Sequence, residues 1–317
     1  MVGIKEVAKS ANVSISTVSY ALNGSNKVSE ATRNRIKDIA KNLGYTPKLA
    51  ARTLKGNKTN IIGVYVSGFQ GEFYGELLDG VQHQLETLGY DMMVNSGNRT
   101  QKFLNEKLFD GAIVLDKKFH NNELQEALDG GSKIVALDRH LQHKNARTVL
   151  LDNRPGAQEA VEYLLNQHMD KYYLVSGPLG NYDMSIRLDS ALERFEKDKV
   201  PVEIIEGDFT EQSGFDAAEQ IVKSTGQHTA GVFTFSDDEA CGFYRYLKND
   251  ANRISKQFKL VGFDNNRSAD LLNPVFPSIS YHKHLWGETA ASTLVDLIEN
   301  KASVEDKLIK TSLSYRH

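Results

Sequence analysis

From residue 60 onward, short β-rich segments alternate with helical ones, and this alternation limits the possible folds more than any other feature. Ten segments are predicted strands: 61–66, 91–95, 111–115, 133–137, 148–151, 171–175, 202–206, 231–235, 259–263 and 278–281. Apolar residues at helical spacing lie between them, as at Leu77, Val81 and Leu85. Such alternation predicts parallel sheets with helices on both faces. Because ten strands fit two small sheets better than one, we expect an α/β body of two doubly wound lobes and a cleft.

The ends of these strands carry small, hydroxyl and carboxylate side chains. Ligands of open parallel sheets bind beyond the carboxyl ends of the strands, where this chain has Ser67, Asp138, Ser236, Asp237 and Asp264. Candidate aromatic walls are Phe73, Tyr74, Phe209 and Trp286, although any single ring is more often a core residue. Planar apolar walls with a few polar groups suit a sugar.

The first 58 residues differ from the rest in charge. They hold 11 Lys and Arg against 3 Asp and Glu, whereas the whole chain holds 38 against 41. A basic segment on an acidic body predicts contact with a polyanion. A solvated basic tail is the alternative, but such tails lack regularly spaced apolar residues, and Ile4, Val7, Ala8 and Ala11 follow helical spacing. We therefore expect a folded basic head.

Three short helices are predicted in this head, over about 4–11, 15–22 and 30–43. Ser14 and Ser29 are placed to cap the second and third, and Gly44 to end the third. This is the helix-turn-helix layout, in which the second helix enters the major groove; a protein-binding three-helix module is the alternative that the charge disfavours. Predicted base contacts are Ile15, Ser16 and Tyr20, predicted phosphate contacts are Thr17, Ser19 and Arg33, and further DNA contacts are Asn23 and Ser29.

Four linked motifs in the head resemble the lac repressor/galactose repressor family. They are residues 4–8 (IKEVA), 13–23 (VSISTVSYALN), 28–33 (VSEATR) and 43–47 (LGYTP). The resemblance implies a transcriptional regulator that binds a pseudo-palindromic operator as a homodimer. The family often has Arg where this chain has Tyr20, so we expect a different operator preference.

Residues 47–58 form the linker from head to body, and the candidate hinge within it is about 48–56. A flexible tether is one interpretation, because Gly56-Asn57 ends it. The resemblance implies instead a hinge helix that forms on DNA and pairs with its twin in the minor groove, with Ala51 at the helix contact and Leu54 wedged between base pairs.

The resemblance extends into the body through residues 177–179 (GPL), 206–209 (EGDF), 213–215 (SGF) and 261–264 (VGFD). It implies a periplasmic-binding-protein-like core in which the chain crosses between lobes three times. Arg187 and Asp264 match the effector-binding pair, and Phe73, Asp138, Phe209, Ser236 and Asp237 are further predicted contacts. Ser236 departs from the Asn usual in the family. The stretch between Asn95 and Gly111 is short, which predicts a trimmed helix.

These features predict a head of residues 1–58 and an effector-binding core of residues 59–317. Lobe 1 is expected to comprise about 60–150 and 282–308, and lobe 2 about 153–278 and 310–317. One cysteine, Cys241, excludes an intrachain disulfide. There is no apolar run of membrane-spanning length and no secretion-signal layout at the start, so we expect a cytoplasmic protein.

Catalysis is not expected. The sequence has no Walker A, Gly-x-Gly-x-x-Gly or His-Glu-x-x-His motif. His140 with His143, or His282 with His284, would offer two metal ligands but no second cluster, so neither a metal nor another cofactor is predicted.

The function we expect is repression of carbohydrate-metabolism genes, gated by a sugar or sugar phosphate. Two alternatives stay open: a global carbon regulator gated by a phosphocarrier protein, and a sugar-binding transport component. The sequence leaves undecided the effector's identity, the operator, whether the effector induces or co-represses, and dimer against tetramer.

Overall fold

The computed structural model describes residues 2–22, 25–45, 58–69, 72–97, 99–248, 253 and 256–315. The chain divides into two compact units, Met1–Thr59 and Asn60–His317. Within the described residues, no helix has the length and apolar character needed to cross a membrane.

The described residues of the first unit form three helices, α1 (Ile4–Ala11), α2 (Ile15–Leu22) and α3 (Glu30–Asn42). Val7, Val18 and Ile36 are fully buried between them. The Ser14 hydroxyl accepts the Thr17 backbone N–H at 3.0 Å, and Ser29 accepts the Thr32 N–H, so both predicted caps are present. The predicted helix-turn-helix is confirmed.

Lobe 1 of the second unit is built on a six-stranded sheet in the order β11-β5-β4-β3-β1-β2. Its strands are β1 (Ile61–Val66), β2 (Asp91–Asn95), β3 (Gly111–Leu115), β4 (Ile134–Ala136), β5 (Ala146–Asp152) and β11 (Lys307–Lys310). All neighbouring strands run parallel. The helices are α5 (Phe73–Thr87), α6 (Lys102–Asn105), α7 (Asn121–Asp129) and α13 (Lys283–Ile298).

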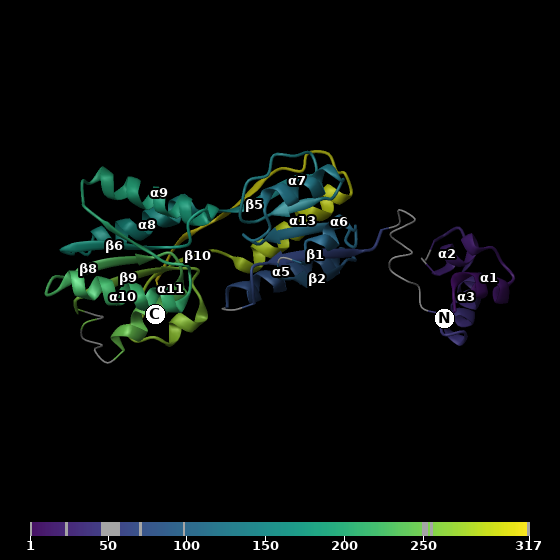
Figure 1. The fold of residues 1–317 in the computed structure, drawn as a ribbon, viewed down its shortest axis with the longest axis horizontal. Helices are drawn as coiled ribbons and strands as arrows, with labels where there is room; N and C mark the ends of the chain where they lie inside the picture. The colour runs from purple at the N-terminus through teal and green to yellow at the C-terminus, as the bar shows by residue number, and fades with distance from the viewer. Residues whose placement is uncertain are drawn as a thin grey trace. The chain divides into compact units, whose positions relative to one another are not determined.

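Lobe 2 repeats this plan with the order β12-β10-β9-β8-β6-β7 (Figure 1). Its strands are β6 (Lys171–Ser176), β7 (Glu203–Glu206), β8 (Ala230–Thr234), β9 (Phe258–Phe263), β10 (Ser278–Ser280) and β12 (Ser312–Ser314). Only β12 is antiparallel to its neighbour. The helices of lobe 2 among the described residues are α8 (Asn153–Leu165), α9 (Tyr182–Lys197), α10 (Glu211–Thr225), α11 (Asp237–Leu247) and the short 3₁₀ helix η1 (Arg267–Leu271).

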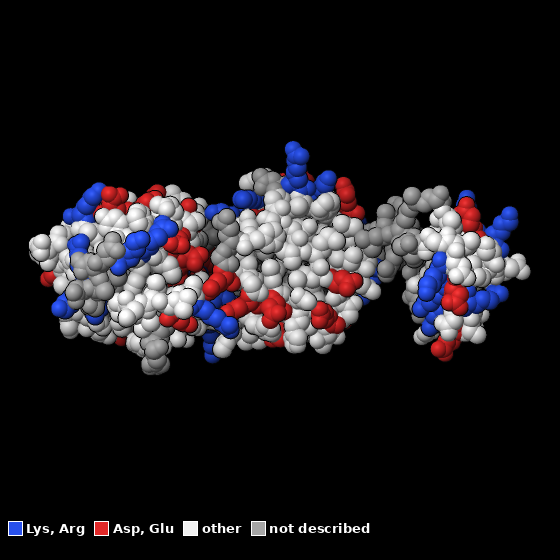
Figure 2. Space-filling view, turned by 90° about the horizontal axis from the view of Figure 1, so that it is seen from below, with Lys and Arg blue, Asp and Glu red and all other residues white. Residues whose placement is uncertain are grey.

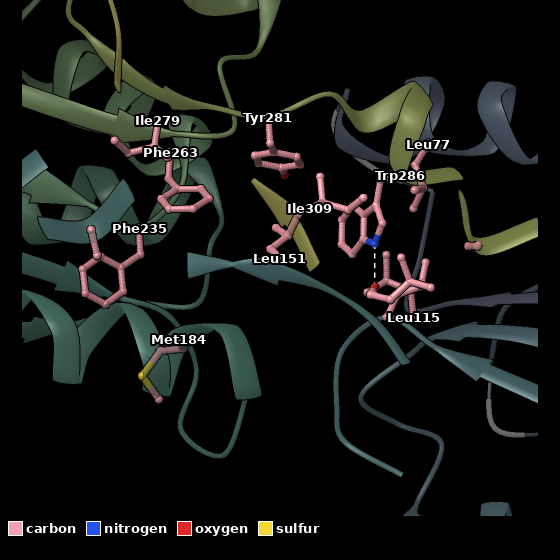
Figure 3. Packing of buried hydrophobic residues seen from close by; sticks show 14 of the residues in the cluster. Leu77, Leu115, Leu151, Met184, Phe235, Phe263, Ile279, Tyr281, Trp286 and Ile309 are labelled. Atoms are coloured by element: carbon pink, nitrogen blue, oxygen red, sulfur yellow. Dashed lines mark hydrogen bonds between the residues drawn. The ribbon is translucent and has the colours of Figure 1, made fainter. Parts of the chain in front are cut away.

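The chain passes between the lobes three times, from β5 to α8, from β10 to α13 and from β11 to β12. Figure 3 shows the apolar core at these crossings: Tyr281, Leu151 and Ile309 lie between the lobe 2 residues Phe263 and Phe235 and the lobe 1 residue Trp286. The predicted two-lobed α/β fold is confirmed. All ten predicted strands are present within one or two residues at each end, whereas β11 and β12 were not predicted.

In each lobe, two helices approach closely at glycines. A Cβ atom at Gly80 of α5 would lie 2.0 Å from the carbonyl oxygen of His284 in α13, and one at Gly214 of α10 would lie 2.0 Å from that of Glu239 in α11. Larger residues at these positions would separate the helices. The glycines therefore determine the helix spacing in both lobes.

Candidate functional site

A cleft of about 1050 Å³ lies between the two lobes at the carboxyl ends of their strands. Six of the seven predicted effector residues line it: Phe73, Asp138, Arg187, Phe209, Ser236 and Asp264. The crossovers bring these residues together from segments almost 200 positions apart.

Arg187 of α9 is held rigidly at the cleft. It is buried, its Nε donates to Asn153 Oδ1 at 2.9 Å, and its Nη1 donates to the carbonyl oxygen of Phe235 at 2.6 Å. The guanidinium carbon lies 3.4 Å from the centre of the Phe263 ring. Packing and two hydrogen bonds thus orient the planar group before any ligand binds.

Asp264 follows β9 with an unusual backbone. Its φ of 105° lies in the region that side chains rarely adopt, and such strain concentrates at ligand sites. The Asp264 carboxylate accepts the Tyr281 hydroxyl at 2.7 Å, and Lys283 Nζ donates to its backbone carbonyl. Burial raises the pKa of Asp264, while Arg187 and Lys283 act in the opposite direction.

Asp183 is a buried acid beside Arg187 that the sequence analysis missed. Asn153 Nδ2 donates to Asp183 Oδ1 at 2.7 Å, so one amide links this acid to Arg187. Burial raises the pKa of Asp183 to about 6, against the opposing effects of Arg187 and Asn153. No sequence motif marks Asp183, because it lines the cleft only through the position of α9 in the fold.

Phe209 covers the cleft from the loop before α10. Its φ is 70°, and its ring lies so close to Gly177 that a Cβ there would be 2.1 Å away. The Phe209 N–H donates to Glu239 Oε1 at 3.0 Å, and the Ser236 hydroxyl donates to the Phe209 carbonyl at 3.3 Å. Ser236 therefore holds the Phe209 backbone in place as well as lining the cleft.

On the lobe 1 side, Asp138 and Phe73 line the cleft. Both carboxylate oxygens of Asp138 accept from Arg139, at 2.8 Å each, which leaves Asp138 well neutralised. The Phe73 ring packs edge-on against Tyr74 and Trp286.

The structure corrects two expectations. Asp237 does not line the cleft: its carboxylate is fully buried and accepts from the Asn266 N–H at 2.7 Å and the Ser278 hydroxyl at 2.6 Å. Trp286 is not a cleft wall either, because it is buried in lobe 1 and its Nε1 donates to the Val149 carbonyl (Figure 3). Strand-end position alone does not distinguish a ligand contact from an internal hydrogen-bonding group.

Acidic groups outnumber basic ones around the cleft. Its described lining carries seven carboxylates, Glu72, Asp138, Asp183, Asp208, Glu211, Asp238 and Asp264, against Lys117, Arg187 and Arg245. Burial raises the pKa of Asp238 to about 6, and nearby Asp264 and Glu72 act in the same direction. Figure 2 shows carboxylates gathered where the two lobes meet.

In the head, α2 presents the residues predicted to contact bases. Ile15, Ser16 and Tyr20 are exposed, and Lys27 Nζ lies 5.0 Å from the Tyr20 ring centre. Thr17 and Ser19 are half-buried, with the Thr17 hydroxyl 2.9 Å from that of Ser14. Lys and Arg side chains surround this unit on the face drawn in Figure 2.

The remaining predicted DNA contacts either make hydrogen bonds within the head or lie outside the described residues. Arg33 is half-buried, and its guanidinium donates to the carbonyls of Ser25 and Val28. These hydrogen bonds stabilise the loop before α3. The phosphate contact of Arg33 stays a prediction, as does the DNA contact of Ser29, whose hydroxyl caps α3. Asn23, Ala51, Leu54 and the hinge at 48–56 lie outside the described residues.

A helix-turn-helix unit joined to a two-lobed body with a polar cleft defines a ligand-responsive DNA-binding protein. Residues 3–48 match the family described as bacterial regulatory proteins, lacI family, and residues 161–317 match the periplasmic binding protein-like domain. The chain belongs to the lacI family and is a DNA-binding transcriptional repressor with an effector-binding core. Members of this family regulate transcription and are not enzymes.

Relatives match over nearly the whole chain. The HTH-type transcriptional repressors PurR of Vibrio atlanticus and of Escherichia coli O139:H28 are 30% and 31% identical, each over 95% of this chain and 93% and 92% of their own lengths. A sugar-binding transcriptional regulator of the LacI family from Enterococcus faecalis is 39% identical, with a TM-score of 0.77 over 82% of this chain and 97% of its own. A CelR–cellobiose complex is 25% identical, with a TM-score of 0.74 over 100% and 99%.

Proposed function

We propose that this repressor acts on carbohydrate-metabolism genes as a cytoplasmic homodimer and that its effector is a neutral, hydroxyl-rich small molecule such as a sugar. The observation that carries the effector class is the charge of the cleft. Asp138 is paired with Arg139, and the six other carboxylates of the lining still outnumber its three cationic side chains, so the cleft would repel a phosphate group and a sugar phosphate fits less well. Carboxylates instead accept hydrogen bonds from hydroxyl groups.

The arrangement of the cleft also supports a sugar. Phe73 and Phe209 offer apolar faces, and Arg187 and Asp264 offer a donor and an acceptor between them. Within the described part of the chain, Arg187 Nη2 makes no hydrogen bond, which leaves this donor for a ligand. The sugar-binding regulator of E. faecalis and the cellobiose complex of CelR are consistent with this class of ligand.

On the DNA side, we propose that Ile15, Ser16 and Tyr20 contact base edges while Thr17, Ser19, Asn23, Ser29 and Arg33 support the helix or contact the backbone. The exposure of Ile15, Ser16 and Tyr20 on α2 supports this division. Asp138, Ser236 and Phe209 are proposed to shape the effector cleft around the Arg187–Asp264 pair, whereas Asp237 serves only within lobe 2.

The test is a thermal-shift screen of the whole protein against neutral sugars, sugar phosphates and nucleobases, followed by operator binding with and without each hit. We expect a neutral sugar to raise the melting temperature and to change operator affinity. Nucleobases are included because aromatic walls would also accept a planar ring. Stabilisation by phosphorylated sugars alone would contradict the proposed ligand class.

The ligand found in this screen can then be used to test whether Arg187 and Asp264 bind it. Asp264→Asn and Arg187→Lys keep most of the packing but remove a charge or a fixed fork, so each should weaken the hit about 5- to 150-fold, equivalent to about 1 to 3 kcal/mol. Operator affinity without effector should stay within error of the parent. Arg154→Ala is the matched control, because among the described residues Arg154 forms only an exposed ion pair with Glu193. If both cleft variants bound the effector as tightly as the parent, the effector would have to bind elsewhere.

A further inference from the structure

The crossing of α5 and α13 in lobe 1 brings three metal-ligating side chains together. His83 comes from α5, and His284 and Glu288 come from successive turns of α13; one ligand atom of each lies within 4.8 Å of the other two. None of the three lines the effector cleft. The cluster is therefore separate from the site described above.

The distances within the cluster suit one small cation. Nδ1 of His83 is 3.0 Å from Glu288 Oε1, and Nδ1 of His284 is 3.5 Å from the same oxygen. Tetrahedral Zn²⁺ with bonds of about 2.0 to 2.1 Å separates its ligand atoms by roughly 3.3 Å. An ion between these atoms would need only small side-chain shifts.

Asp79 supplies the outer contact that metal-binding histidines commonly have. Its Oδ2 is 3.3 Å from His284 Nε2, on the opposite side of the ring from Glu288. If Nε2 carries the proton toward Asp79, the Nδ1 lone pair faces the cluster. A carboxylate in this position fixes the tautomer and strengthens the imidazole as a ligand.

The backbone beneath the cluster is rigid. A Cβ at Gly80 would lie 2.0 Å from the carbonyl oxygen of His284, and one at Gly287 would lie 2.2 Å from that of Leu77. Between His284 and Glu288, Trp286 anchors α13 through its hydrogen bond to Val149. The ligand positions are thus set by helix packing, while the His83 side chain, 65% exposed, leaves the cluster open to solvent.

We propose that His83, His284 and Glu288 form a binding site for a divalent transition-metal ion, preferentially Zn²⁺, with Asp79 orienting His284. Imidazole with carboxylate suits Zn²⁺, Ni²⁺ and Cu²⁺, whereas Mg²⁺ prefers oxygen ligands alone. Three protein ligands leave a coordination position for water or for a group from another molecule. Other His–carboxylate contacts, such as His228 with Asp170 at 3.8 Å, involve one histidine each.

The test is titration of the tag-free, full-length protein with Zn²⁺ by calorimetry, with Mg²⁺ as the control ion. We expect one Zn²⁺ per chain with low-micromolar affinity and an increase in melting temperature, because the ion binds the folded chain. Mg²⁺ should give no saturable heat.

Variants assign the site. His83→Ala, His284→Ala and Glu288→Gln should each reduce Zn²⁺ affinity at least about 10-fold, and Asp79→Asn should reduce it while leaving the stoichiometry at one. His228→Ala is the matched control and should bind like the parent. His83 is exposed, so its variant should fold even if that of His284 does not. Zn²⁺ binding unchanged by His83→Ala, or no saturable binding at millimolar Zn²⁺, would overturn the proposal.

Discussion

Glu239 shows how one buried acid supports the cleft. It is fully buried, its Oε1 accepts from the Phe209 N–H and the Ser213 hydroxyl, and its Oε2 has no hydrogen-bond partner among the described residues. Burial raises the pKa of Glu239 to about 8 from its ordinary 4.5. The side chain is therefore largely protonated at neutral pH, and it holds the backbone of Phe209 over the cleft without placing a charge there.

This protonation predicts a pH dependence of stability. Between pH 4.5 and pH 8 the unfolded chain has lost the Glu239 proton while the folded chain keeps it, so the free energy of unfolding falls as the pH rises, by at most about 1.4 kcal/mol per pH unit, and levels off above pH 8. Glu239→Gln retains the acceptor and removes the titration. Urea unfolding from pH 5 to pH 9 should give a flatter profile for the variant, and parallel profiles would show that Glu239 is ionised in the fold.

At the level of helices, glycine spacing determines how closely α5 and α13 pack. Gly80 faces the His284 carbonyl at a distance that excludes any side chain, whereas Gly75, one to two turns earlier in α5, has nothing within 4 Å of its Cβ position. The same helix therefore contains a position that requires glycine and one that does not.

Gly80→Ala should destabilise the core by about 1 to 3 kcal/mol, because overpacking forces the helices apart. Gly75→Ala is the matched control and should be neutral or stabilising by up to about 1 kcal/mol, since alanine favours a helix. Chemical unfolding of both variants measures the difference. Equal stabilities would mean that the two helices adjust without cost.

The hinge helix that the family resemblance implies for residues 48–56 leads to a prediction that concerns DNA alone. Leu54→Ala keeps helix propensity but removes the apolar wedge, so operator bending and affinity should fall by a few kcal/mol at most, while the melting temperature of the free protein stays unchanged. A circular-permutation gel compares the bend angles. Identical bending by parent and variant would contradict a wedge at Leu54.

The whole molecule separates DNA binding from effector binding into two compact units, Met1–Thr59 and Asn60–His317. The basic charge is concentrated in the first, and the carboxylates of the cleft belong to the second. Coupling between them requires an effector that binds one arrangement of the lobes more tightly than the other.

Two measurements follow for the whole molecule. Operator affinity should fall steeply and linearly on a log–log plot against salt concentration, because Lys and Arg of the head displace counterions from phosphates.

A fragment beginning at residue 60 should keep the effector-induced rise in melting temperature yet bind no operator. An effector response that needs the head, or operator binding indifferent to salt, would contradict this division.

The sequence by itself was enough to predict the helix-turn-helix, its two serine caps, ten of the strands and the two-lobed α/β body. These features depend on local periodicity, capping chemistry and alternation, which are visible within a few neighbouring residues. The strands β11 and β12 escaped prediction because each is short and is defined by pairing with β5 or β10, more than 30 residues away in sequence.

The composition of the cleft was decided only by the tertiary structure. Asp183 and Asp238 enter it, and Asp237 turns away to bond Asn266 and Ser278, although Asp237 and Asp238 are adjacent in sequence. His83 and His284, 201 positions apart, meet because two glycines let their helices approach. Packing over long sequence separations determines which polar groups meet a ligand and which satisfy one another inside the fold, and no local pattern encodes that choice.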